Sequence, residues 1–221
     1  MPFMKHAAWC ARRRLAALVD ACEGVALIEF AYSLPIMVVL GLGGLELINY
    51  TTAHLRVNQI AISLADNASR AKQEVVSGDP KFREVDANES IRAAQLQGGN
   101  LDLKENGRVI LSSLEVNDDG GQWIHWQRCG GDTAHVSRYG EEGTGETGTS
   151  FEGMGTGTRL VKAEPNFAIM YAEVFYDYKP LIFRGLIPEQ TIYKTAAMYV
   201  RDDRDLSDIF NPEPESTPSL C

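Results

Sequence analysis

The stretch GVALIEFAYSLPIMVVLGLGGLELINY, residues 24–50, decides the fold of this 221-residue chain. No other segment of the sequence is both long and apolar enough to cross a lipid bilayer. At a rise of about 1.5 Å per residue, roughly 20 helical residues span the hydrocarbon core, so residues 25–50 predict a transmembrane helix. The segment ends in polar residues rather than in a small-residue cleavage motif, which distinguishes it from a cleavable secretory signal.

Glu29 lies near the start of this apolar run. A carboxylate inside a membrane is costly unless it finds a partner, so Glu29 is a candidate functional residue. If the chain were cleaved after Gly24, Val25 would carry a free ammonium group one helical turn from Glu29. In a bundle of such helices, the ammonium of one subunit could pair with the carboxylate of its neighbour and set the register of packing.

The order of residues in this run forms a pattern. Gly24 precedes Glu29 and Phe30, and Pro35 follows them. The remaining members of the pattern are Gly41, Gly43, Gly44 and Glu46. This pattern resembles the N-terminal signature of the TadE-like family, the pseudopilins of the tight-adherence (type IVc) pilus system. A weaker echo of the family lies in residues 173–180 and 196–201.

The resemblance implies a processing site, a set of partners and a pilin-like plan. In that family a prepilin peptidase cleaves after the glycine, and the proteins act in pilus assembly at the inner membrane. It therefore implies Gly24 as the cleavage residue, Val25 as the first mature residue, and Glu29 with Phe30 as the acidic part of the motif. The implied partners are the prepilin peptidase, other pilin-like subunits, the inner-membrane pilus assembly machinery and membrane lipid.

Membrane-anchored proteins that are not pilins can show the same pattern of hydropathy. A signal-anchor helix that carries an isolated glutamate would also read as one long apolar run. The alternative interpretation is therefore a single-span, membrane-anchored binding or sensor protein with an extracytoplasmic head. Cleavage after Gly24 separates the two interpretations.

The charges predict the topology. Three arginines at positions 12–14 precede the apolar run, whereas Arg56 is the only basic residue in the first stretch beyond it. The positive-inside rule then places the basic leader, residues 1–24, in the cytoplasm and the head in the periplasm, as a single-pass inner-membrane protein. The net charge is −9, and the leader holds four basic and two acidic residues, so the remainder carries −11. An acidic head argues against nucleic-acid binding.

Three residues inside the apolar run bear on helix shape and packing. Pro35 removes a backbone hydrogen bond, so we expect a kink or local unwinding there. Gly41 and Gly44 would let another helix approach closely, which suits packing between subunits. Glycine is also common in membrane helices generally, and the sequence does not decide between these two interpretations.

Beyond residue 50 the apolar residues thin to a stripe. Val57, Ile60, Leu64 and Ala68 recur at intervals of three or four, which predicts an amphipathic continuation of the same helix over residues 51–78, with its end near residue 76. A short second helix is expected at residues 87–97, with Asp86 as its N-cap, Glu89 as the capping-box partner and Gly98 as its stop.

The rest of the head, residues 79–205, reads as a sheet. Alternating patterns predict strands at residues 109–116, 122–127, 167–179 and 191–201. The first two strands are separated by the turn-rich residues 117–121, a hairpin signal. The fold class is therefore α+β, with a long N-terminal helix and a small antiparallel sheet.

Two segments are expected to lack regular structure. Residues 140–158 are rich in glycine and threonine and are expected to form a flexible surface loop that buries little apolar area. The spacing Gly143-x-Gly145-x-x-Gly148 within them lacks the flanking strand and helix of a dinucleotide site, so we expect no cofactor there. Residues 206–221 are expected to form a proline-rich tail.

The chain shows no pattern of catalytic residues. Its histidines, at positions 6, 54, 125 and 135, lack the spacing of metal ligands. No Gly-x-Ser-x-Gly, His-Glu-x-x-His or Cys-x-x-Cys motif occurs. We therefore expect no catalytic, cofactor-binding or metal-binding residues, and we do not expect an enzyme.

Four cysteines divide between the two sides of the membrane. Cys10 and Cys22 lie in the leader, on the cytoplasmic side, whereas Cys129 and Cys221 lie on the side where disulfides can form. A bond between Cys129 and Cys221 would attach the tail to the head, with an upper limit of about 4 to 5 kcal/mol in the chain-entropy treatment. The alternatives are a free terminal thiol or a link to another subunit.

Overall fold

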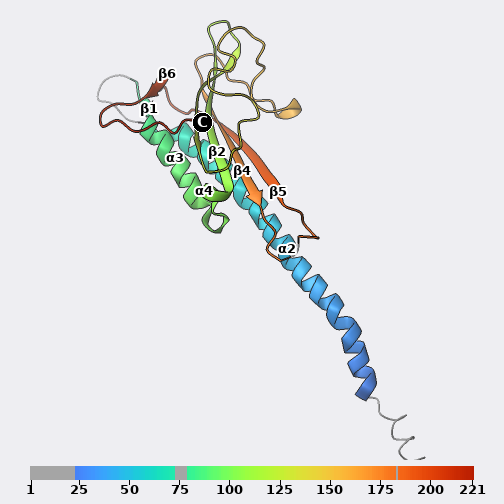
Figure 1. Ribbon diagram of the computed structural model, residues 1–221. Helices are drawn as coiled ribbons and strands as arrows, with labels where there is room; N and C mark the ends of the chain where they lie inside the picture. The colour runs from blue at the N-terminus through green and yellow to red at the C-terminus, as the bar shows by residue number, and fades with distance from the viewer. Residues whose placement is uncertain (1–22, 73–78, 183) are drawn as a thin grey trace, which may run out of the picture. The chain divides into compact units, whose positions relative to one another are not determined.

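The computed structural model describes residues 23–72, 79–182 and 184–221, so the expected leader lies almost entirely outside it (Figure 1). The chain divides into two compact units, residues 1–48 and 49–221, and helix α2 contributes to both. The helices are α2 (Glu23–Arg70), α3 (Glu84–Gln97) and α4 (Leu103–Asn106), with short 3-10 turns η1 (Gly99–Leu101) and η2 (Gly157–Arg159). The strands are β1 (Lys81–Arg83), β2 (Gly107–Val116), β3 (Gln122–Gly130), β4 (Ile169–Tyr178), β5 (Gln190–Tyr199) and β6 (Asp205–Phe210). The fold is α+β, as expected.

The second half of α2 supplies one wall of the core of the unit at residues 49–221. Its apolar residues recur every three or four positions, which puts them on a single face of the helix. The buried residues of this face are Ala53, Val57, Ile60, Ala61, Leu64, Ala65 and Ala68. They form one hydrophobic cluster with the strands of the sheet. Burial of this face therefore holds the helix to the head.

Helix α2 ends at Arg70, earlier than expected, because a side chain from the far end of the chain occupies its C-terminus. The buried Arg204 guanidinium donates hydrogen bonds to the carbonyl oxygens of Ala68 (3.2 Å) and Ser69 (2.7 Å). Carbonyls in the last turn lack partners within the helix, and a cation there also opposes the negative end of the helix dipole. The rest of the expected continuation, residues 73–78, lies outside the described residues.

Four strands form one antiparallel sheet in the order β3-β2-β4-β5. The expected hairpin joins β2 to β3. In its turn the side-chain oxygen of Asn117 accepts hydrogen bonds from the backbone N–H groups of Asp119 (3.0 Å) and Gly121 (2.7 Å). Gly120 has a φ of 80°, a conformation that favours glycine. Strands β4 and β5 also occupy the segments expected for them.

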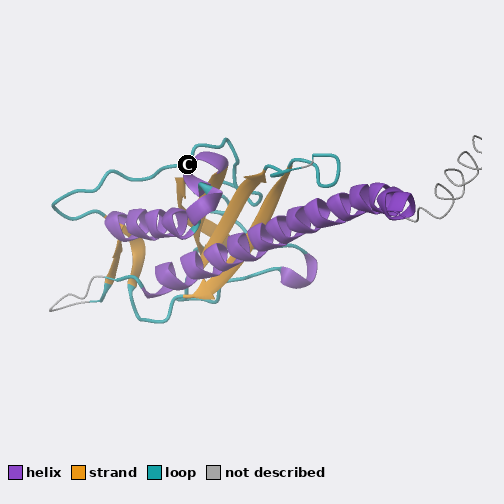
Figure 2. Ribbon diagram, turned by 90° about the horizontal axis from the view of Figure 1, so that it is seen from below, coloured by secondary structure: helices purple, strands orange, loops and turns teal. Residues whose placement is uncertain are grey.

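Helices α2 and α3 cover one face of this sheet (Figure 2). Alternate residues along each strand point toward the helices, because successive side chains of a strand face opposite sides. The strand residues of the cluster on this face include Val109, Leu111, Met170, Ala172, Val174 and Ile192. Near α3, Phe82 stacks on Trp126 with their ring centroids 5.1 Å apart. The core of the head therefore lies between the sheet and these helices.

Helix α3 begins at Glu84, before the expected start, and Asp86 is not its N-cap. The Asp86 carboxylate lies at the third helical position, where it accepts hydrogen bonds from the backbone N–H of Arg83 (3.0 Å) and from the Arg83 guanidinium (2.8 Å). Arg83, rather than Asp86, is therefore the N-cap residue, and Asp86 takes the place expected for Glu89, where it accepts from the N-cap backbone N–H. The start at Arg83 carries no sequence signal, because N-cap patterns rely on a side-chain oxygen that accepts from the helix N–H groups, and arginine has none. The helix ends before Gly98, as expected.

The long segment between β3 and β4 covers the opposite face of the sheet, and one expectation about it is wrong. Residues 140–158 do bury apolar surface, because Met154 is fully buried in a cluster with Ile124 and Tyr171. The same segment also pairs with the edge of β3, where the backbone N–H of Ile124 donates to the carbonyl oxygen of Thr144 (2.9 Å). The glycine- and threonine-rich composition does not reveal how much of this segment is buried, because the apolar surface on which it packs belongs to the sheet.

The tail expected at residues 206–221 is also more structured than the sequence indicates. It contains most of β6, which pairs in parallel with β1. Further along, Ser219 donates from its hydroxyl to the side-chain oxygen of Asn88 in α3 (2.6 Å) and accepts at its carbonyl from the backbone N–H of Cys129 (2.7 Å). Cys221 then forms the expected disulfide with Cys129. The tail is thus attached to both α3 and β3.

A buried ion pair joins α3 to the sheet. The Arg128 guanidinium on β3 donates to the Glu84 carboxylate at 2.8 Å, and the two side chains are only 6% and 4% exposed. Glu142, in the segment that covers the other face, accepts a second hydrogen bond from Arg128 at 2.6 Å. Burial of two charges is costly, so each depends on the other for compensation.

We expect Glu84→Gln to destabilise the head by about 3 kcal/mol, because it leaves the buried Arg128 charge with only the more exposed Glu142 as partner. Thermal unfolding of the full chain in detergent would measure the loss. Asp66→Asn is the control, since Asp66 pairs with the exposed Arg70 and Arg201 and should cost well under ~1 kcal/mol. Equal losses for the two variants would contradict the account.

Candidate functional site

The residues of the expected processing site lie together in the first turns of α2. Gly24, Val25, Glu29 and Phe30 are all exposed, with Val25 at 56% and Phe30 at 61%. Within a helix, residues four apart lie on the same face one turn away, so Val25 and Glu29 are neighbours along the helix surface. The peptide bond between Gly24 and Val25, which would be cleaved, therefore lies one helical turn from Glu29 on an exposed surface of α2.

The first half of α2 exposes its apolar side chains around the whole helix. One 18-residue window of this helix is apolar enough to cross a membrane, and none of that window is buried. The large side chains exposed here are Val25, Leu27, Ile28, Phe30, Tyr32, Leu34, Ile36, Met37, Val38, Val39, Leu40, Leu42, Leu45, Leu47 and Ile48. A helix that is apolar all round needs an apolar environment. This half of the helix is therefore long and apolar enough to cross a membrane.

Pro35, Gly41 and Gly44 lie within this half of α2. Pro35 lies inside the helix, which continues on both sides of it. A Cβ atom added at Gly41 or Gly44 would meet nothing within 4 Å. No contact within the chain therefore requires glycine at these two positions, and a role in packing against another helix stays a prediction.

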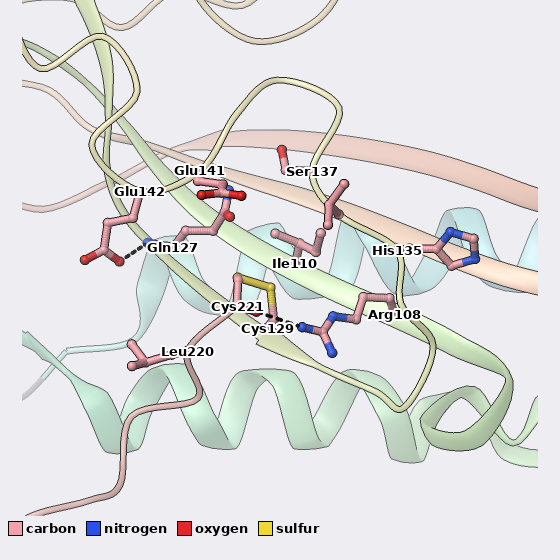
Figure 3. Close-up of a pocket in the computed structure, with 11 residues that line it drawn as sticks. Arg108, Ile110, Gln127, Cys129, His135, Ser137, Glu141, Glu142, Leu220 and Cys221 are labelled. Carbon is pink, nitrogen blue, oxygen red and sulfur yellow. Dashed lines mark hydrogen bonds between the residues drawn. A yellow bond between two sulfur atoms is a disulfide. The ribbon is translucent and has the colours of Figure 1, made fainter.

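The head has a cavity of about 440 Å³ beside the disulfide (Figure 3). Its lining residues come from β2, β3, the covering segment and the C-terminal end, and they include Arg108, Gln127, His135, Glu141, Glu142 and the bonded cysteines. The Arg108 guanidinium donates to the carbonyl oxygens of Gly131 (2.8 Å) and Cys221 (3.4 Å), whereas its Nε has no hydrogen-bond partner. The cavity therefore combines charges of both signs, and one of its lining residues, Ser137, donates its hydroxyl to the buried Glu173 carboxylate.

A buried carboxylate at the centre of β4 was missed by the sequence analysis. Glu173 is completely buried and accepts hydrogen bonds from the Ser137 hydroxyl (2.5 Å), the Arg138 backbone N–H (3.1 Å) and the Tyr193 hydroxyl (2.8 Å). Burial and the neighbouring Glu173 charge raise the pKa of Tyr193. Because Ser137 and Arg138 belong to the covering segment, these hydrogen bonds fasten that segment to the sheet. The sequence signal for this buried carboxylate is a single acidic residue within the otherwise apolar strand at residues 169–175.

Two histidines of the head pair with carboxylates. The Nδ1 atom of His125 lies 3.0 Å from Glu115, and the Nε2 atom of His135 lies 2.8 Å from Asp177. Burial lowers the pKa of His125, but the hydrogen bond to Glu115 and its charge outweigh burial, so the pKa is raised overall. Within the described residues, no group of three or more histidine, cysteine, aspartate or glutamate side chains could hold a metal ion.

Comparison of the chain with protein-family models, with curated proteins and with solved structures found no match. The geometry of α2 and of the head therefore carries the functional argument.

We expect the stability that His125 contributes to depend on pH. The folded pKa is raised, so the contribution is fully present below the unfolded value of about 6.5 and is lost as the pH rises through the folded value. Replacing His125 by Gln should therefore cost about 1 kcal/mol more near pH 5.5 than near pH 8.5.

Thermal unfolding of the full chain at several pH values would measure this difference between variant and wild type. Glu115→Gln serves as the matched control, because it removes the carboxylate that raises the pKa while leaving His125 in place. The pH dependence of the His125→Gln effect should disappear in that background. A cost that is constant across this pH range in the wild-type background would refute the pairing.

Proposed function

We propose that this chain is a TadE-like pseudopilin, anchored in the inner membrane, whose head works in the assembly of a tight-adherence pilus. The observation that carries the proposal is the division of α2. Its first half exposes apolar side chains all round, whereas its second half packs on an antiparallel sheet. This is the stem-and-head plan that the resemblance at residues 24–50 implies.

The disulfide supports the side of the membrane that the charges predict. Cys129 and Cys221 are bonded in the head, and structural disulfides persist in oxidising compartments such as the periplasm. The basic leader points to the opposite side by the positive-inside rule. Two independent features of the chain therefore agree on a cytoplasmic N-terminus and a periplasmic head.

Glu29 supplies a mechanism for assembly. Its carboxylate is exposed on the first half of α2, in the part of the chain that would lie in the membrane. A carboxylate there gains most from a positively charged partner, and cleavage after Gly24 would create one at the amino group of Val25. In the proposed mechanism the amino group of one subunit pairs with Glu29 of the next. The buried charge of Glu29 is then compensated only when the two helices pack in the correct register.

The alternative, a single-span binding or sensor protein, draws support from the cavity beside the disulfide. Its volume of about 440 Å³ falls within the range of small-molecule sites, and it contains Arg108 with an unpaired Nε. This function would need neither cleavage nor Glu29. The two functions are therefore separated by tests on the first turns of α2.

We expect the mature protein to begin at Val25, and Gly24→Arg to retain the leader, because a peptidase that reads this motif needs a residue without a side chain before the cut. Intact mass measurement of the protein purified from its native membrane would show the difference. Leu96→Arg is the control, because it introduces the same residue at an exposed position of α3 in the head and leaves the processing site untouched. A native mass that includes the leader would remove the main support for a pseudopilin.

We expect Glu29→Leu to leave membrane insertion intact, because it removes a buried charge, and to reduce recovery of pilus assembly components with the protein. Alkaline extraction of membranes measures insertion, and affinity purification from the native membrane measures association. Tyr32→Leu is the matched control, since Tyr32 is also exposed, 76%, on the first half of α2. Equal recovery with wild type and with Glu29→Leu would contradict the role of Glu29.

A further inference from the structure

The connection between β4 and β5, residues 179–189, carries aliphatic side chains that the head leaves exposed. Leu181 is 72% exposed, Ile182 45% and Leu186 47%. We call these three residues the apolar tip. Single exposed leucines are normal on a protein surface, whereas three exposed aliphatic side chains within one short connection make it a candidate contact surface.

The exposure of the apolar tip follows from how the connection is anchored. Ile187, directly after Leu186, is buried in the same core cluster as the second half of α2. Pro180 and Pro188 lie on either side of the connection, and neither can donate a backbone hydrogen bond. Ile187 therefore packs into the core of the head, whereas the side chains of the apolar tip stay largely exposed.

The apolar tip lies at the end of the head from which the chain continues into the apolar run. Strand β4 runs antiparallel to the second half of α2 and ends at Tyr178 (Figure 1). The Tyr178 hydroxyl accepts a hydrogen bond from the Asn49 side-chain amide (3.0 Å), and its ring meets that of Tyr50 edge to face at 5.1 Å. Residues 49 and 50 are also the last residues of the apolar run, so the chain passes into this run at the end of the head that carries the tip.

The residues around the apolar tip are those that favour a membrane surface. Tyrosine is enriched where the hydrocarbon core meets the headgroups, and Tyr50 and Tyr178 lie together there. Arg184, within the connection, exposes 83% of its side chain, and Lys179 lies next to Pro180. Such side chains bury their aliphatic stems near lipid while their charges reach the headgroups.

We propose that the apolar tip inserts into the interfacial region of the bilayer that holds the first half of α2. The inference rests on the membrane placement of that half and not on a role in pilus assembly. Lipid fits the patch better than a second copy of the chain, because a stable protein interface buries about 800 Å² on each partner, far more than three side chains offer. The covalent continuation at residue 49 also brings a bilayer to the tip without any further partner.

The insertion gives the head a second attachment to the membrane. A single helix leaves a head free to tilt and to rotate about the point where it enters the bilayer. A shallow aliphatic contact beside that point restricts both motions, although it adds little to an anchor that is already a transmembrane helix. The function of the apolar tip is therefore to orient the head relative to the membrane surface.

The test compares two tryptophan variants of the full chain in vesicles of phosphatidylethanolamine and phosphatidylglycerol that carry bromine high on their acyl chains. Leu186→Trp places the probe in the apolar tip. Phe167→Trp is the matched control, because Phe167 is 49% exposed and lies just before β4, at the opposite end of that strand. The wild-type signal is subtracted to remove the native tryptophans.

We expect brominated lipid to quench Leu186→Trp and to shift its emission to shorter wavelength, whereas Phe167→Trp shows neither effect. Absence of quenching in Leu186→Trp, while the chain resists alkaline extraction, would overturn the inference and leave the membrane anchor intact. A blue shift without quenching would indicate a protein neighbour, such as a second copy, and would also overturn it. Loss of the chain from the vesicles at alkaline pH would overturn both the inference and the membrane placement.

Discussion

The rest of the structure depends on one constraint, which is that the single helix α2 must satisfy two different environments. Its 48 residues form one hydrogen-bonded element, so its backbone is satisfied in either environment, and only the side chains differ. In the first half they are mostly apolar and exposed, apart from the exposed Glu29 and the buried Glu46; in the second half only one face is apolar, and that face is buried. The change from one pattern to the other near residue 49 sets where the head begins.

The head then depends on the second half of α2 for its core and on long-range polar contacts for its edges. Arg204 closes the end of α2 from more than 130 residues away, and the pair of Arg128 with Glu84 joins α3 to the sheet. Glu173 holds the covering segment, and the disulfide of Cys129 with Cys221 holds the tail. A small head with one sheet has limited apolar surface to bury, so such contacts attach the segments that its core does not reach.

Local patterns predicted the elements well, and contacts between distant residues account for what they missed. The periodicity of Val57, Ile60 and Leu64 and the alternation along β2 and β4 are visible in any short window, and so is the hairpin at residues 117–121. The early end of α2 could not be read this way, because the residue that ends it, Arg204, is remote in sequence. The same reason explains the missed strand β6 and the burial of Met154. At the candidate site, the sequence located Gly24, Glu29 and the cysteine pair, while Glu173 and the cavity at Arg108 need the sheet to be assembled first.

The most direct test of the account is to measure accessibility along α2, residue by residue, in the full chain embedded in lipid nanodiscs. Nuclear magnetic resonance can compare relaxation by dioxygen, which concentrates in the hydrocarbon core, with relaxation by a water-soluble nickel chelate. The account predicts that residues 25–48 respond to dioxygen and not to nickel, and that Val57 and Leu64 on the buried face respond weakly to both. Strong relaxation of residues 25–48 by nickel would contradict the claim that one helix serves both lipid and the core of the head.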